Sequence, residues 1–169
     1  MKRHHVAAIT LALSLTGLTG CASPSAETPP AVSVSAEPTM SIKEAGETYT
    51  KLSAASNAAR EKWMNAPAPT KANLARHKKL AAGAAKATTA FSKGLRKNQW
   101  PSDVQTIIDA LDEHLQERAA AYQRAAKAET VTAYLTAAQE IPVTTSLTAQ
   151  LRTALGLPES PIVQGVTPR

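Results

Sequence analysis

Apolar side chains recur every three or four residues through most of the chain between positions 41 and 157. That spacing places them on one face of an α-helix, with polar residues on the opposite face. The pattern predicts four helical stretches, which begin near Ser41, Thr70, Ser102 and Thr130. Runs of β-branched and aromatic residues, which are typical of strands, do not occur, so the sequence predicts an all-α fold.

Residues with strong preferences for helix ends mark the boundaries of these stretches. Ser41 lies three positions before Glu44, and this pair predicts a capping box at the first helix. The pair Ser102 and Gln105 predicts a second capping box at the third helix. Thr70 is the expected N-cap of the second helix.

The fourth stretch contains Pro142 in its middle. Before the proline, one face is apolar and consists of Val131, Leu135 and Ala138. After it, the apolar positions fall on the opposite side of an uninterrupted helix, at Leu147, Leu151 and Leu155. The helix is therefore expected to kink or break near Pro142, so that both halves face one core. Because the connections are short, we expect an antiparallel four-helix bundle in up-down-up-down order.

The composition predicts a thin core. The hydrophobic fraction is 43%, but much of it is alanine, and there is only one phenylalanine. Such a core suits helices that approach each other closely through small side chains. The single cysteine, Cys21, excludes an internal disulfide bond.

The first twenty residues have the layout of an export signal. A short basic start, Met1 to His5, precedes an apolar stretch at residues 6–18. This stretch is shorter than the roughly 20 apolar residues of a membrane-spanning helix, and it fits the apolar region of a signal peptide.

The segment that follows, Leu18-Thr19-Gly20-Cys21, resembles the lipobox of bacterial lipoproteins. The resemblance implies cleavage after Gly20 and a diacylglycerol thioether on Cys21. Two or three acyl chains such as palmitate, at about 0.8 kcal/mol per CH₂, would hold the chain at the outer face of the cell membrane.

These signals divide the chain into four parts. We expect a lipoprotein signal peptide at 1–20, a lipidated and disordered tether at 21–40, a helical-bundle domain at 41–158 and a flexible tail at 159–169. The tether is rich in Pro, Ser and Ala, and as a coil it would span roughly 25 Å.

The layout resembles that of small lipoproteins found in actinobacteria, which combine a lipobox, a low-complexity tether and an Ala-rich helical domain. The residues that carry this resemblance are Tyr49, Asn57, Trp100-Pro101, Val104 and Leu155-Gly156-Leu157-Pro158. The resemblance implies a cell-envelope location and a helical fold, but no particular activity.

The most distinctive charge pattern lies in the second predicted helix. Residues 70–97 include eight basic side chains and no acidic one. Loss of Lys2 and Arg3 with the signal would lower the formal charge of the chain from +6 to +4, so the rest of the mature chain is net negative. On a helical wheel the candidate stripe consists of Lys71, Lys78, Lys86, Lys93 and Lys97.

Two interpretations of this stripe remain open. It is either a binding surface for anionic phospholipid or acidic cell-wall polymer, or a solvated face that is partly paired with the acidic third helix. Nucleic acid is not an expected partner, because the compartment is extracytoplasmic and the stripe has no interleaved aromatic residues. The sequence identifies no protein partner.

These features favour a non-enzymatic binding or scaffolding module whose only bound group is the covalent lipid. The alternative is a carrier of a small ligand or metal in the bundle core, where His77 and His114 would be the candidate metal ligands. The helical stretches contain no nucleophile elbow and no glycine-rich phosphate loop, so an enzyme is not expected. Trp63 and Trp100 lie at helix ends, either as a ligand- or membrane-contacting pair or as end caps of the core.

Overall fold

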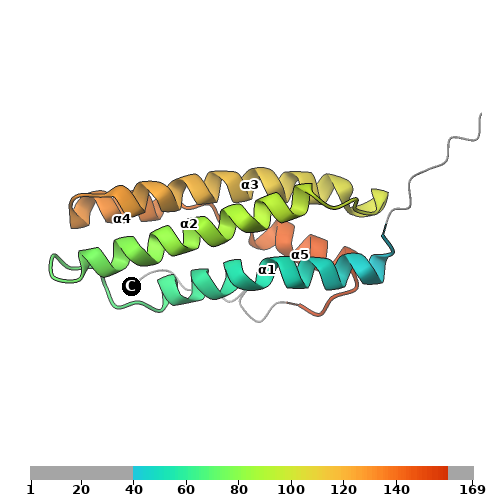
Figure 1. The fold of residues 1–169 in the computed structure, drawn as a ribbon, viewed down its shortest axis with the longest axis horizontal. Helices are drawn as coiled ribbons and strands as arrows, with labels where there is room; N and C mark the ends of the chain where they lie inside the picture. The colour runs from blue at the N-terminus through green and yellow to red at the C-terminus, as the bar shows by residue number, and fades with distance from the viewer. Residues whose placement is uncertain (1–39, 160–169) are drawn as a thin grey trace, which may run out of the picture. The chain divides into compact units, whose positions relative to one another are not determined.

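The computed structural model describes residues 40–159, and every regular element in this range is an α-helix (Figure 1). The all-α prediction is therefore confirmed for the described residues. The helices are α1 (Ile42–Met64), α2 (Leu74–Arg96), α3 (Ser102–Lys127), α4 (Val131–Gln139) and α5 (Thr145–Ala154). The predicted signal peptide, nearly all of the tether, and residues 160–169 of the tail lie outside the described residues.

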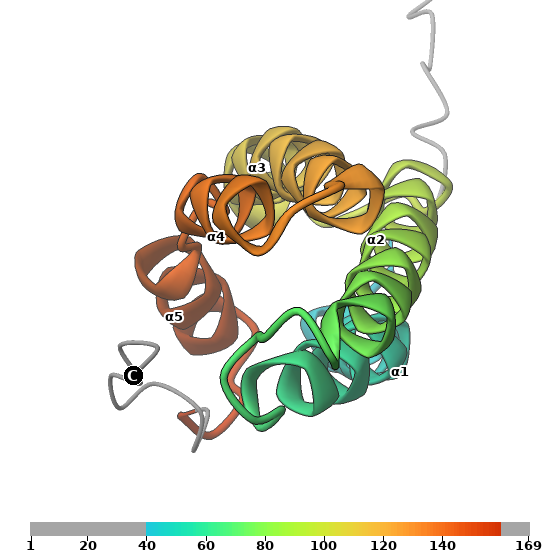
Figure 2. The ribbon, with the colours of Figure 1, turned by 90° about the vertical axis from the view of Figure 1, so that its left-hand side faces the viewer.

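All five of these helices belong to one compact unit. Helix α2 packs against α1 and α3, and α3 packs against α4 and α5. Viewed along the helices, α1, α2 and α3 follow one another around the core, and α4 and α5 close the remaining side (Figure 2). Among residues 40–159, no helix has the length and apolarity needed to cross a bilayer.

Two hydrophobic clusters fill the interior, one towards each end. The first joins α1, α2, α3 and α5 through large side chains that include Tyr49, Leu95, Leu111 and Leu151. The second joins α2, α3 and α4 and consists mostly of alanines around Tyr122 and Tyr134. Helix α5 therefore covers one end of the core and α4 covers the other.

Small residues allow the helices to approach closely, as the composition predicts. A side chain at Gly94 of α2 would place its Cβ only 2.5 Å from Cδ2 of Leu52 on α1. Seven alanines on α1, α2 and α3 are buried. Dispersion contacts between closely spaced backbones therefore provide part of the packing energy that larger side chains provide in other cores.

The ends of the helical region follow the sequence signals. At α1, the backbone N–H of Glu44 donates to Ser41 Oγ at 3.3 Å, and the backbone N–H of Ser41 donates to Glu44 Oε2 at 2.8 Å. The predicted capping box at Ser41 is therefore confirmed. After α5, Gly156 adopts a φ of 64°, and the N–H of Leu157 returns to the carbonyl of Arg152 at 2.8 Å. This is the Schellman arrangement that a glycine at this position favours.

Helix α2 begins four residues later than Thr70, so the predicted N-cap is wrong. The N–H of Thr70 donates to Asn73 Oδ1 at 2.6 Å, and the N–H of Asn73 donates to Thr70 Oγ1 at 3.3 Å. These reciprocal bonds close a turn, which precedes the helix. As a consequence, Lys71 lies in the turn and outside α2.

The capping box predicted at Ser102 is also wrong. Ser102 is already the first helical residue of α3, and Pro101 occupies the N-cap position without a side-chain capping bond. The hydroxyl of Ser102 donates to the neighbouring Asp103 carboxylate at 3.3 Å. Proline fixes a backbone angle that suits a helix start, so the helix begins there without a side-chain cap.

The fourth stretch is broken, which is one of the two outcomes predicted at Pro142. Helix α4 ends at Gln139 and α5 begins at Thr145, so the described residues contain five helices. The face predicted for α5 is confirmed at Leu151 and at the C-cap Leu155, which are buried, while Leu147 is half-buried. The face predicted for α4 is wrong at Leu135, which is 43% exposed. Ala138 of that face is half-buried against the second cluster, and the fully buried residues of α4 are Tyr134 and Ala137.

Candidate functional site

Helix α2 presents a continuous row of lysines to solvent. Lys79, Lys86 and Lys93 of α2 are exposed, and so is Lys97, the C-cap residue that continues the helical backbone; they follow each other at intervals of seven, seven and four residues. At 100° per residue these positions lie within about 40° of one another, and they extend over about 27 Å. We call these four residues the lysine stripe.

The structure changes the membership of the predicted stripe. Lys86, Lys93 and Lys97 are in the row, and Lys79 was missed although its spacing of seven residues from Lys86 is visible in the sequence. Lys71 does not belong to the stripe, because it lies in the turn before α2.

Lys78 is half-buried and is rotated about 100° from the row. It shares the angular position of Arg96, whose Nη1 lies 3.1 Å from Asp112 Oδ2 on α3. Lys78 therefore belongs to the side of α2 that faces α3.

Acidic partners do not compensate the lysine stripe. Among residues 40–159, the ion pairs closer than 4.0 Å between arginine or lysine and a carboxylate are Arg96 with Asp112 and Arg124 with Glu140. The lysines of α2 take part in none of them. The stripe therefore retains its positive charge for a ligand or for solvent.

A groove of about 530 Å³ runs beside the stripe, between α2 and α3. Its lining is dominated by small side chains and lysines: Ala82, Ala85, Lys86, Thr89, Ala90 and Lys93 from α2, and Gln123, Ala126 and Lys127 from α3. No carboxylate is among these residues. The third helix thus adds one lysine, Lys127, to the positive surface.

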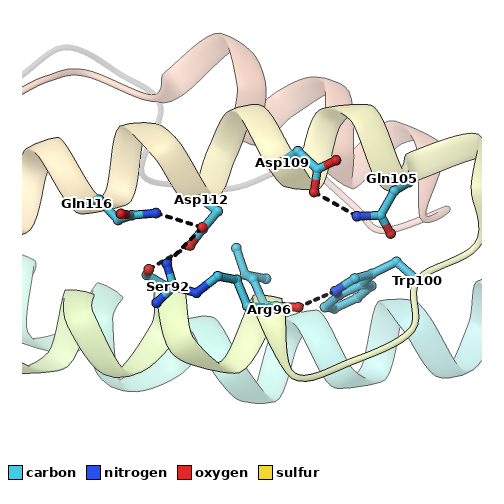
Figure 3. Close-up of polar contacts among 8 residues, drawn as sticks. Ser92, Arg96, Trp100, Gln105, Asp109, Asp112 and Gln116 are labelled. Carbon is cyan, nitrogen blue, oxygen red and sulfur yellow. Dashed lines mark hydrogen bonds and ion pairs between the residues drawn. The ribbon is translucent and has the colours of Figure 1, made fainter.

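A buried carboxylate ties α2 to α3 beyond the groove (Figure 3). Asp112 is 8% exposed and accepts hydrogen bonds from Ser92 Oγ at 2.6 Å, Gln116 Nε2 at 2.8 Å and Arg96 Nη1 at 3.1 Å. Both of its oxygens are therefore satisfied. This group is a structural connection, and its geometry offers no free base for catalysis.

A second polar connection holds the segment between α4 and α5. Arg118 of α3 donates to the carbonyl of Pro142 from Nε at 3.1 Å and from Nη2 at 3.0 Å, and Nη2 also donates to Thr144 Oγ1 at 2.6 Å. Burial lowers the pKa of Arg118, and the neighbouring charge of Arg60 lowers it further. The guanidinium stabilises the break at Pro142 by binding the carbonyl that the missing helical turn leaves free.

The two candidate metal ligands occupy different surroundings. The ring of His77 is buried and lies 5.5 Å from that of Tyr134 on α4. His114 lies on α3, where its Nδ1 is 3.6 Å from Glu117 Oε2. In the part of the chain that the structure describes, no group of three or more His, Cys, Asp or Glu is arranged to hold a metal ion.

The two tryptophans hold the ends of the core. Trp100 is buried, and its Nε1 donates to the carbonyl of Leu95 at 2.7 Å. Trp63 donates to the hydroxyl of Tyr134 at 2.6 Å and packs edge-on against Tyr122. Because both indole N–H groups are occupied within the fold, the end-cap interpretation fits these residues better than a ligand-binding pair.

Comparisons with protein-family models, with curated proteins and with solved structures gave no match to this chain.

Proposed function

We propose that the protein is a membrane-anchored lipoprotein of the extracytoplasmic face, and that its helical domain is a non-enzymatic binding module for anionic envelope surfaces. The observation that carries the proposal is the lysine stripe of α2, which is exposed and unpaired among residues 40–159. Anionic phospholipid and acidic wall polymer share the phosphate or carboxylate chemistry that such a stripe attracts.

The anchor part of the proposal rests on the sequence of residues 1–21, with its basic start, its apolar stretch and Cys21 at the end. Lipid on Cys21 would keep the domain close to the surface that the stripe contacts. Intact-mass analysis of the protein made by a bacterium with lipoprotein-processing enzymes tests this part. An unmodified Cys21, or retention of residues 1–20, would rule it out.

For the architecture, we propose that α4 and α5 together take the place of the fourth helix of an antiparallel bundle. Support comes from the two core clusters, since α4 contributes to one and α5 to the other. The stripe then lies on the outer side of α2, away from both clusters.

The expected strength of the contact follows from the number of lysines. Each lysine near an anionic bilayer contributes about 1 kcal/mol, so the four stripe residues together contribute about 4 kcal/mol, or roughly a thousandfold in partition. Salt weakens the attraction, because the Debye length is about 10 Å at 0.1 M ionic strength. An anchor that holds the domain at the surface makes a contact of this size effective.

Vesicle sedimentation tests the proposal with a matched pair of variants. The first, K86E/K93E/K97E, reverses three charges of the stripe, and the second, K43E/K51E/K62E, reverses three exposed lysines of α1. Both variants change the net charge by the same amount. We expect the stripe variant to lose binding to phosphatidylglycerol vesicles and the α1 variant to keep most of it. Equal loss in both would mean that net charge alone, and not the stripe, attracts the protein.

A further inference from the structure

The groove between α2 and α3 combines two kinds of chemistry. Its small side chains, among them Ala90 and Ala126, form an apolar lining, and three lysines belong to the same lining. Lys86 and Lys93 lie two helical turns apart, about 10 Å along α2, and Lys127 approaches from α3. The lining therefore offers positive charge and apolar surface within one site.

This combination discriminates between the anionic ligands that the stripe could attract. A wall polymer or another polar polyanion would use the lysines and gain little from alanine side chains. An anionic phospholipid carries its phosphate next to glycerol and acyl carbons, so it would use both. Large exposed apolar side chains, which could serve a deeply inserting surface, do not line the groove.

We infer that the α2–α3 groove is a contact site for anionic phospholipid, with Lys86, Lys93 and Lys127 binding headgroup phosphates and the alanine lining touching the carbon atoms beneath them. The inference rests on the proposed function and deepens it, because it names the ligand and orients the domain. Both α2 and α3 would face the bilayer, and α1 would face away from it.

The test separates the apolar part of the groove from its charge. In the variant A90Q/A126Q, two alanines of the lining become neutral, polar and larger, while every lysine stays. Glutamine is a good helix former, so the helices are expected to persist. The control A54Q/A55Q makes the same changes at two exposed positions of α1.

The protein for this experiment is the chain 22–169, which contains all five helices of the compact unit. Its circular dichroism verifies the fold of each variant. Partition is measured onto phosphatidylglycerol vesicles and, separately, onto inorganic polyphosphate. We expect A90Q/A126Q to weaken vesicle binding by about tenfold relative to the control and to leave polyphosphate binding unchanged.

The outcomes distinguish the inference from the function on which it rests. Equal vesicle binding by A90Q/A126Q and A54Q/A55Q would overturn the groove while leaving the lysine stripe intact. Binding of the unmutated chain to polyphosphate but not to vesicles would identify a polar polymer as the ligand and also overturn the groove. Failure of the unmutated chain to bind either probe would overturn the proposed function itself.

Discussion

The Asp112 carboxylate connects α2 to α3, so its removal should lower the stability of the fold. In D112A, Ser92 Oγ loses the acceptor that it contacts at 2.6 Å, and Ser92 is only 2% exposed, so water cannot replace it. Loss of a buried hydrogen bond to a charged group costs about 1.5–3 kcal/mol. The side chain of Arg96 is 48% exposed, so its ion pair adds at most about 1 kcal/mol. We therefore expect D112A to lower the free energy of unfolding by about 3 kcal/mol.

Asp109 provides a matched control one helical turn away. Its carboxylate accepts a hydrogen bond from Gln105 at 2.7 Å, but this pair lies on the exposed face of α3 (Figure 3). The variant D109A should cost less than about 0.5 kcal/mol.

Urea unfolding of the chain 22–169, followed by circular dichroism, measures both variants. With a slope of about 2 kcal/mol/M, D112A should lower the unfolding midpoint by about 1.5 M, and D109A should barely move it. A double variant S92A/D112A should recover part of the loss, because it removes the unsatisfied hydroxyl as well. If D112A and D109A shift the midpoint equally, Asp112 is not the buried connection that the structure describes.

Three further predictions concern packing, the α4–α5 connection and alkaline pH. A Cβ atom added at Gly83 would meet open space, so G83A should stabilise α2 by about 0.5–1 kcal/mol in thermal unfolding, whereas G94A should gain nothing because Leu52 blocks the added methyl group. R118M should speed amide exchange in residues 140–148 by about tenfold, because it frees the Pro142 carbonyl; unchanged exchange would contradict this role. Burial raises the pKa of Tyr49, Tyr122 and Tyr134 above the ordinary value of 10.0, so the folded state holds these protons more tightly than the unfolded state. Urea midpoints should therefore fall as the pH rises past about 10.

Local signals in the sequence predict local structure well. Ser41 and Glu44 form the expected capping box because both partners lie within one turn. Pro142 breaks the fourth stretch because proline acts on its own backbone and on the preceding residue. The prediction placed the start of α2 too early, because Thr70 and Asn73 bind each other in a turn that precedes the helix. The spacing of three residues between them is compatible with such a turn as well as with a helix start.

Features that depend on distant partners were not predictable in this way. The buried face of α4 follows Tyr134, whose hydroxyl meets Trp63 from a helix far earlier in the chain. The groove requires residues 82–93 of α2 beside residues 123–127 of α3, a pairing that exists only once the two helices pack. Asp112 resembles a surface acid in the sequence, because its burial depends on Ser92 and Arg96 of the neighbouring helix. In contrast, Lys79 could have been found from its seven-residue spacing alone.

The central claim, that an unpaired lysine stripe on α2 binds anionic surfaces, is tested most directly by the salt dependence of vesicle partition. The chain 22–169 is titrated onto phosphatidylglycerol vesicles and onto neutral phosphatidylcholine vesicles at increasing sodium chloride concentrations. The account predicts tight binding to the anionic vesicles at low salt, a steep fall as salt rises, and little binding to the neutral vesicles at any salt. Equal partition onto both kinds of vesicle, or no partition onto either, would contradict it.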